Sequence, residues 1–124
     1  MPQPNVLFLC ADDLCHVNHM LSVLVNGFDL PNLRRIATTG TEFDRAYCAV
    51  PVCEPARAAV MTGFSPADTK SFDLSIGWKQ LVHPRNLWTY QLRRAGYWMG
   101  TTGKIFHGYV PQPDYVYAEL YDSA

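Results

Sequence analysis

The feature that most limits the possible folds is a continuous apolar run near the N-terminus. Residues Asn5 to Ala11 read NVLFLCA, with no alternation of polar and apolar side chains. Such a run is typical of a strand buried on both faces, as in a parallel sheet covered by helices. Helical patterns follow it, so the sequence predicts an α/β fold: a partial, mostly parallel sheet with flanking helices. A chain of 124 residues holds only a few such strands, so we expect residues 1–124 to form a single, incomplete α/β domain.

Two adjacent carboxylates, Asp12 and Asp13, end this apolar run. In open α/β sheets, ligands bind at the carboxyl ends of the strands, and hard divalent cations take carboxylate oxygens. A metal site is therefore one interpretation. The other is a solvated loop opening, or one Asp that caps the following turn. The position directly after a predicted buried strand favours the metal site.

A second possible metal pattern overlaps the first. Cys10, Cys15, His16 and His19 give the spacing C-x4-C-H-x2-H, so zinc has to be considered. The spacing matches no standard structural zinc pattern, and Cys10 lies within the predicted buried strand. Packing cysteines and loop histidines are the favoured interpretation.

The stretch from Ala49 to Gly63, AVPVCEPARAAVMTG, predicts a helix that begins near Cys53. Pro55 suits the first turn and Gly63 suits the position after the last turn. A helix N-terminus favours negative charge, and Arg57, one turn further, adds a permanent positive charge. The pattern indicates an anion pocket that contains a nucleophile. A half-buried Cys beside a surface Arg is the alternative.

Two further helices are predicted, with an irregular stretch between them. Pro31 to Thr39 has Pro in its first turn and is followed by Gly40, and Arg85 to Ala95 has apolar residues at helical spacing. The stretch from Phe64 to Pro84 is rich in Ser, Asp, Pro and Gly, which predicts an irregular surface segment.

A predicted strand, Tyr97 to Thr102, leads into Gly103-Lys104-Ile105-Phe106-His107-Gly108. An ammonium group can hold an anionic oxygen, and an imidazole can donate a hydrogen bond or move a proton. Taken singly, Lys104 is read as a solvated loop residue and His107 as a packing histidine. The pair just beyond a strand end makes a functional role as plausible as a structural one.

Composition excludes several classes of protein. Hydrophobic residues make up 48% of the chain and the formal net charge is -1, which argues against disorder and against nucleic acid as the main partner. No apolar run approaches the roughly 20 residues of a membrane span. The N-terminus lacks the pattern of a signal peptide, so a cytoplasmic location is expected. Four cysteines are too few here to indicate a disulfide framework.

Taken in order, four of these segments resemble the N-terminal part of the type I sulfatases, which belong to the alkaline-phosphatase-like superfamily. The segments are NVLFLCADD (5–13), PNLRRIATTGTEFDRA (31–46), CEPARAAVMTG (53–63) and TGKIFH (102–107). Each is weak alone, but their combination is specific and covers nearly the whole chain. The form GKIFH is most similar to the iduronate-2-sulfatase-like branch.

The resemblance implies a sulfuric ester hydrolase whose substrate is a sulfate ester. Asp12 and Asp13 would be ligands of one Ca²⁺ ion. Cys53, in the C-x-P-x-R signature, would be oxidised to formylglycine, whose hydrate would be both the nucleophile and a further metal ligand. Arg57 would hold that hydrate, and Lys104 and His107 would contact the hydrate and the sulfate. A second hydroxyl on the hydrate would allow sulfate to be expelled, a route that an ordinary Ser or Cys lacks.

The chain departs from the family pattern at two points. Ala56 stands where the usual signature has Ser. Members of the family are also several times longer, and their remaining metal ligands and catalytic residues have no counterpart after His107. The chain therefore resembles an N-terminal piece: an excised part, a truncated reading frame, or one chain of a split protein.

Three functions remain open at this stage. The first is a sulfatase that is complete only with a missing C-terminal portion. The second is a phosphonate monoester or phosphodiester hydrolase of the same superfamily. The third is a non-catalytic truncated domain or a partner-dependent module, which could self-associate through an uncovered sheet.

Overall fold

The computed structural model describes residues 3–14, 30–75, 83–107 and 118–122. The chain divides into two compact units, Met1–Asp44 and Arg45–Ala124, and each is described here by itself. In the described ranges the regular structure is helical, apart from one bridge residue, Gly100. The single domain and the α/β sheet remain predictions. No helix within these ranges is long and apolar enough to cross a membrane.

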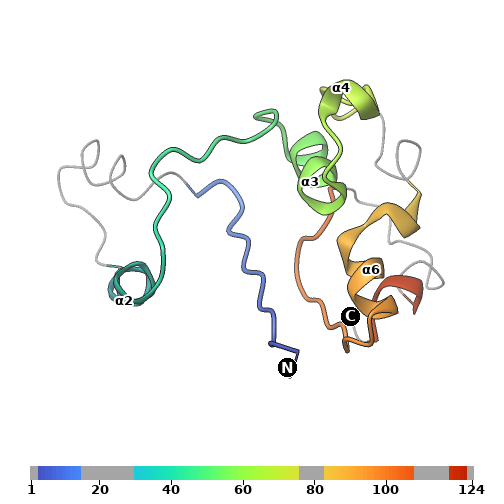
Figure 1. Cartoon of the computed structure of the whole chain (residues 1–124). Coiled ribbons are helices and arrows are strands. Elements are labelled where there is room, and N and C mark those ends of the chain that lie inside the picture. The colour runs from blue at the N-terminus through green and yellow to red at the C-terminus, as the bar shows by residue number, and fades with distance from the viewer. Residues whose placement is uncertain (1–2, 15–29, 76–82, 108–117, 123–124) are drawn as a thin grey trace. The chain divides into compact units, whose positions relative to one another are not determined.

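The N-terminal apolar run has no regular secondary structure, although a strand was predicted for it. Figure 1 shows it as an extended trace. Its side chains are exposed, including Leu7 at 82% and Leu9 at 74%. A strand requires a neighbouring strand, and parallel neighbours are joined through connections of a dozen residues or more. No described segment forms a ladder with this run, so the strand prediction is not met within the described residues.

The first unit also contains helix α2 (Pro31–Thr39), with the bounds that the sequence predicted. Pro31 lies in its first turn, and the N–H of Gly40 donates to the carbonyl of Ile36 at 2.9 Å. The possible zinc pattern falls largely outside the described residues, because only Cys10 among its four members is described, and it is exposed.

The second unit is built around helix α3 (Cys53–Thr62). The helix begins at Cys53, as predicted, and is followed by Gly63, whose φ of 75° is the left-handed conformation that glycine adopts without strain. Ala58 and Met61 are buried on its inner face. Among the described residues of this unit, the buried apolar core is formed by Ala58, Met61, Leu87, Leu120 and Tyr121.

The predicted irregular stretch after α3 contains a short helix, α4 (Pro66–Thr69). The Ser65 hydroxyl accepts from the N–H of Asp68, and the Asp68 carboxylate accepts from the N–H of Ser65, which is a capping box. Pro66 and Thr69 are buried, so this part is not the irregular surface segment that its composition predicted. Residues 76–82 of that stretch lie outside the described residues.

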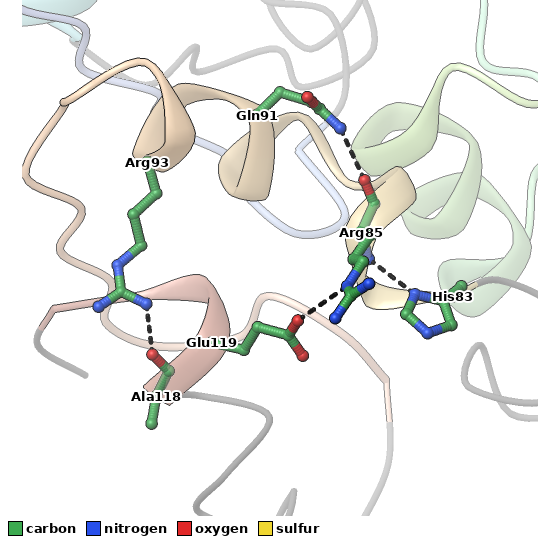
Figure 2. Close-up of polar contacts among 6 residues, drawn as sticks. All are labelled: His83, Arg85, Gln91, Arg93, Ala118 and Glu119. Carbon is green, nitrogen blue, oxygen red and sulfur yellow. Dashed lines mark hydrogen bonds and ion pairs between the residues drawn. The ribbon is translucent and has the colours of Figure 1, made fainter.

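The helix predicted from Arg85 to Ala95 is broken into two pieces. A 3-10 turn, η1 (Pro84–Asn86), precedes helix α6 (Trp88–Arg94). Leu87 lies between them in an extended conformation, with ψ of 139°, and its side chain is fully buried. Burial of this leucine in the core outweighs the local preference for a continuous helix. The amide of Gln91 donates to the carbonyl of Arg85 across the break at 2.8 Å (Figure 2).

Residues 118–122 close the core of the second unit, because Leu120 and Tyr121 are buried there. Arg85 pairs with Glu119 at 3.3 Å, and Arg93 donates to the carbonyl of Ala118 (Figure 2). These contacts attach the segment to η1 and α6.

Asp122 joins this C-terminal segment to the chain that follows α6. Its N–H donates to the carbonyl of Met99 at 2.7 Å, and its carboxylate accepts from the N–H of Met99 at 2.7 Å. These bonds fix the start of the segment that leads to residues 102–107. The strand predicted from Tyr97 to Thr102 is represented only by the bridge residue Gly100.

Candidate active site

The first turn of α3 presents Cys53 at a helix N-terminus. Cys53 is the first residue of the helix and is half-buried. Val52 precedes it in an extended conformation and has no side-chain atom that could accept from the first N–H groups. The positive end of the helix dipole therefore acts at Cys53, where it favours an anion.

Arg57 lies one turn further along α3, and its side chain connects this helix to the segment after α6. Arg57 is only 9% exposed. Its Nη1 atom donates to the carbonyl of Lys104 at 2.6 Å and to the carbonyl of Ile105 at 3.1 Å. Figure 1 shows this segment passing beside α3. The buried guanidinium therefore brings the main chain of Lys104 to the helix that begins with Cys53.

Glu54, which the sequence analysis did not single out, makes a second connection between the same two segments. It is 2% exposed, and its Oε2 atom accepts from the N–H of His107 at 2.7 Å. The helix dipole favours an acidic residue in a first turn, but this preference does not predict that the Glu54 side chain is buried. A long-range bond to a main-chain amide cannot be read from local sequence.

The six predicted site residues divide between the two units. Cys53, Arg57, Lys104 and His107 belong to the second unit, where hydrogen bonds from α3 hold residues 104–107. Lys104 is exposed and His107 is half-buried.

Asp12 and Asp13 lie in a turn of the first unit and both are exposed. Asp13 has φ of 56°, a left-handed conformation that Asp adopts more readily than most residues. The chemistry of the second-unit group is clear from its parts: a thiol at a helix N-terminus, a buried guanidinium, an ammonium group and an imidazole. Side chains of these types stabilise a tetrahedral anion where they converge on it.

The chain is similar in sequence to known sulfatases. The sulfatase family model matches residues 4–121. The chain is 35% identical over 118 residues to a sulfatase of Formosa agariphila, with 88% of this chain and 22% of that protein covered. It is 33% identical over 129 residues to human N-acetylgalactosamine-6-sulfatase (90% and 23% covered) and 29% identical over 110 residues to human iduronate 2-sulfatase (83% and 18% covered). The chain thus spans about a fifth of the length of these relatives. No solved structure gave a significant match.

Proposed function

The chain belongs to the sulfatase family, and on that basis we propose that the full-length gene product hydrolyses sulfuric esters. The observation that carries the proposal is the connection between α3 and residues 104–107. Arg57 donates to the carbonyls of Lys104 and Ile105, so the helix that begins at Cys53 and the segment with Lys104 and His107 are held together. A sulfuryl group bound there would meet positive charge from three sources: the helix N-terminus, Arg57 and Lys104.

Position 53, Lys104 and His107 have distinct roles in this proposal. Position 53 carries formylglycine made from Cys53, and its hydrate supplies the attacking oxygen and a second hydroxyl whose deprotonation lets sulfate leave. Lys104 binds a sulfate oxygen through its ammonium group and offsets the charge that develops during transfer. His107 donates a hydrogen bond to the sulfate and can pass a proton to the departing alcohol oxygen.

A divalent cation, Ca²⁺ in this proposal, is the implied metal, and the donor chemistry of Asp12 and Asp13 suits it. Both side chains are exposed in one turn and offer carboxylate oxygens, the ligands that Ca²⁺ prefers. A cysteine thiol is a soft ligand, so Cys53 suits this ion only after its sulfur has been replaced by oxygen. The ion would polarise the sulfate oxygens.

We also propose that the site is complete only with residues beyond this chain. Ca²⁺ takes six to eight oxygen ligands, and Asp12, Asp13 and the hydrate at position 53 supply only part of that number. The further ligands would come from a region of the full-length gene product that corresponds to the part of the relatives that this chain does not span.

The test compares two cysteine variants of the full-length gene product, expressed together with a formylglycine-generating enzyme. An aryl sulfate is the substrate, assayed with Ca²⁺ and after its removal with a chelator. Cys53→Ala abolishes hydrolysis, whereas Cys48→Ala, which changes an exposed cysteine five residues earlier, leaves the rate unchanged. Hydrolysis by Cys53→Ala at the wild-type rate would refute the proposal. The rate with a matched phosphate ester is measured separately, to test the alternative phosphoester hydrolase activity.

A further inference from the structure

We propose that Glu54 is a positioning residue that sets the place of Lys104 and His107 relative to Cys53, an inference that rests on the proposed function. Glu54 and Arg57 act from the same turn of α3 upon residues 104–107. We call this pair of residues the α3 clamp. Glu54 itself does not touch the substrate in this account. It acts through the main chain of the segment that does.

The burial of Glu54 is the first observation that points to this role. Its carboxylate lies at 2% exposure, next in sequence to the predicted nucleophile. A carboxylate in such a place is unfavourable unless hydrogen bonds compensate for the lost water. The N–H of His107 supplies one such bond at 2.7 Å, the length of a strong, charge-assisted interaction.

The direction of the bonds is the second observation. Arg57 donates to the carbonyls of Lys104 and Ile105, whereas Glu54 accepts from the N–H of His107. Three main-chain groups within four residues are therefore held by side chains of opposite charge. Such contacts fix both the position and the orientation of this backbone relative to the first turn of α3. The position of a catalytic side chain is set first by the backbone that bears it.

The clamp explains why a Glu at position 54 serves this chain better than a shorter or apolar residue. Gln retains an oxygen that can accept from the N–H of His107. Asp keeps the charge but withdraws the acceptor by one methylene group, and Ala removes it. If position is what matters, activity follows the acceptor and its reach, not the charge.

The experiment measures kcat and KM of the full-length gene product for an aryl sulfate in wild type, Glu54→Gln, Glu54→Asp and Glu54→Ala. Rates are divided by the fraction of position 53 that mass spectrometry finds converted, because Glu54 lies within the modification signature. Small displacements of a catalytic group can cost about 100-fold in rate. We expect kcat to fall about 10- to 100-fold in the Asp and Ala variants with little change in KM, and to stay within about threefold of wild type in the Gln variant.

Met61→Ala is the matched control, because Met61 lies in the last turn of the same helix and is buried in the apolar core, at 4% exposure. It weakens the packing of α3 without removing the clamp, so its kcat below the unfolding temperature stays within about twofold of wild type. Equal losses in the Gln and Ala variants, an unchanged kcat in the Asp variant, or an equal loss in Met61→Ala would each overturn the proposal.

Hydrogen exchange separates failure of the clamp from failure of the proposed function. The amide of His107 exchanges slowly in wild type and in Glu54→Gln, and at least about tenfold faster in Glu54→Asp. If wild type does not hydrolyse sulfate esters, the proposed function is wrong, and the exchange rates still decide whether Glu54 holds the segment. Equal exchange rates of the His107 amide in wild type, Glu54→Gln and Glu54→Asp would show that Glu54 does not hold the segment.

Discussion

Replacing Arg57 by Met tests how strongly the guanidinium holds the candidate site together. Met keeps an unbranched apolar side chain and removes the guanidinium donors, including Nη1, which bonds to the carbonyls of Lys104 and Ile105. Arg57 is 9% exposed, and water has little access to the donor side of these bonds. The variant therefore leaves two main-chain acceptors to find other partners.

The size of the effect follows from the two acceptors. A hydrogen bond to a charged donor contributes about 1.5–3 kcal/mol. The two bonds share one nitrogen, so they do not add in full. Lys104 is exposed and water can hydrate its carbonyl in the variant, whereas Ile105 is half-buried. We therefore expect the free energy of unfolding to fall by about 2 kcal/mol.

Urea unfolding of the 124-residue chain, followed by tryptophan fluorescence, measures this loss; of the three tryptophans, Trp88 packs against the core of the second unit. With a slope of about 1–3 kcal/mol per molar urea, the midpoint falls by about 1 M. Arg94→Met is the control, because Arg94 is exposed on α6 and its loss stays within about 0.5 kcal/mol. A midpoint shift below about 0.3 M in Arg57→Met, or an equal shift in the control, would refute the reasoning.

The remaining predictions concern the Ca²⁺ dependence of the activity and the loss of stability at acid pH. In the full-length gene product, Asp12→Asn and Asp13→Asn each raise the Ca²⁺ concentration needed for half-maximal hydrolysis of an aryl sulfate at least about tenfold, whereas Asp44→Asn, an exposed control in the same unit, leaves it unchanged. The N–H of Met99 lowers the pKa of Asp122 below its ordinary value of 3.8. The unfolded chain therefore binds more protons below about pH 4, and the stabilisation from Asp122 is complete above that pH and lost as pH falls. Urea midpoints measured from pH 6 to pH 2.5 should fall less steeply in Asp122→Asn than in wild type, and equal slopes would contradict this assignment.

Helix ends could be predicted from the sequence where proline or glycine marks them. Proline fixes the backbone angle of a first helical turn, and glycine accepts the left-handed conformation after the last one. The bounds of α2 and α3 match the predicted positions: each helix has a proline in its first turn, and α3 is followed by the left-handed Gly63, whereas Gly40 after α2 is extended, with φ of -119°. The broken helix at Leu87 could not be predicted, because the break depends on burial of one side chain in a core assembled from distant residues.

The candidate site shows the same division between local and long-range information. The position of Cys53 at a helix N-terminus, and of the Arg57 charge one turn later, could be predicted from spacing along one helix. The role of Glu54 does not, since its partner is 53 residues away in sequence. The strand predicted for residues 5–11 depends on neighbouring strands that the described residues do not supply, so pattern alone could not determine its structure.

Tandem mass spectrometry of position 53 shows directly whether the cysteine is converted to formylglycine. The full-length gene product, expressed with a formylglycine-generating enzyme, is digested with trypsin, and the peptide from Ala46 to Arg57 is fragmented because it contains both Cys48 and Cys53. We expect formylglycine or its hydrate at position 53 and an unmodified cysteine at position 48. An unmodified cysteine at position 53 under these conditions would contradict the account.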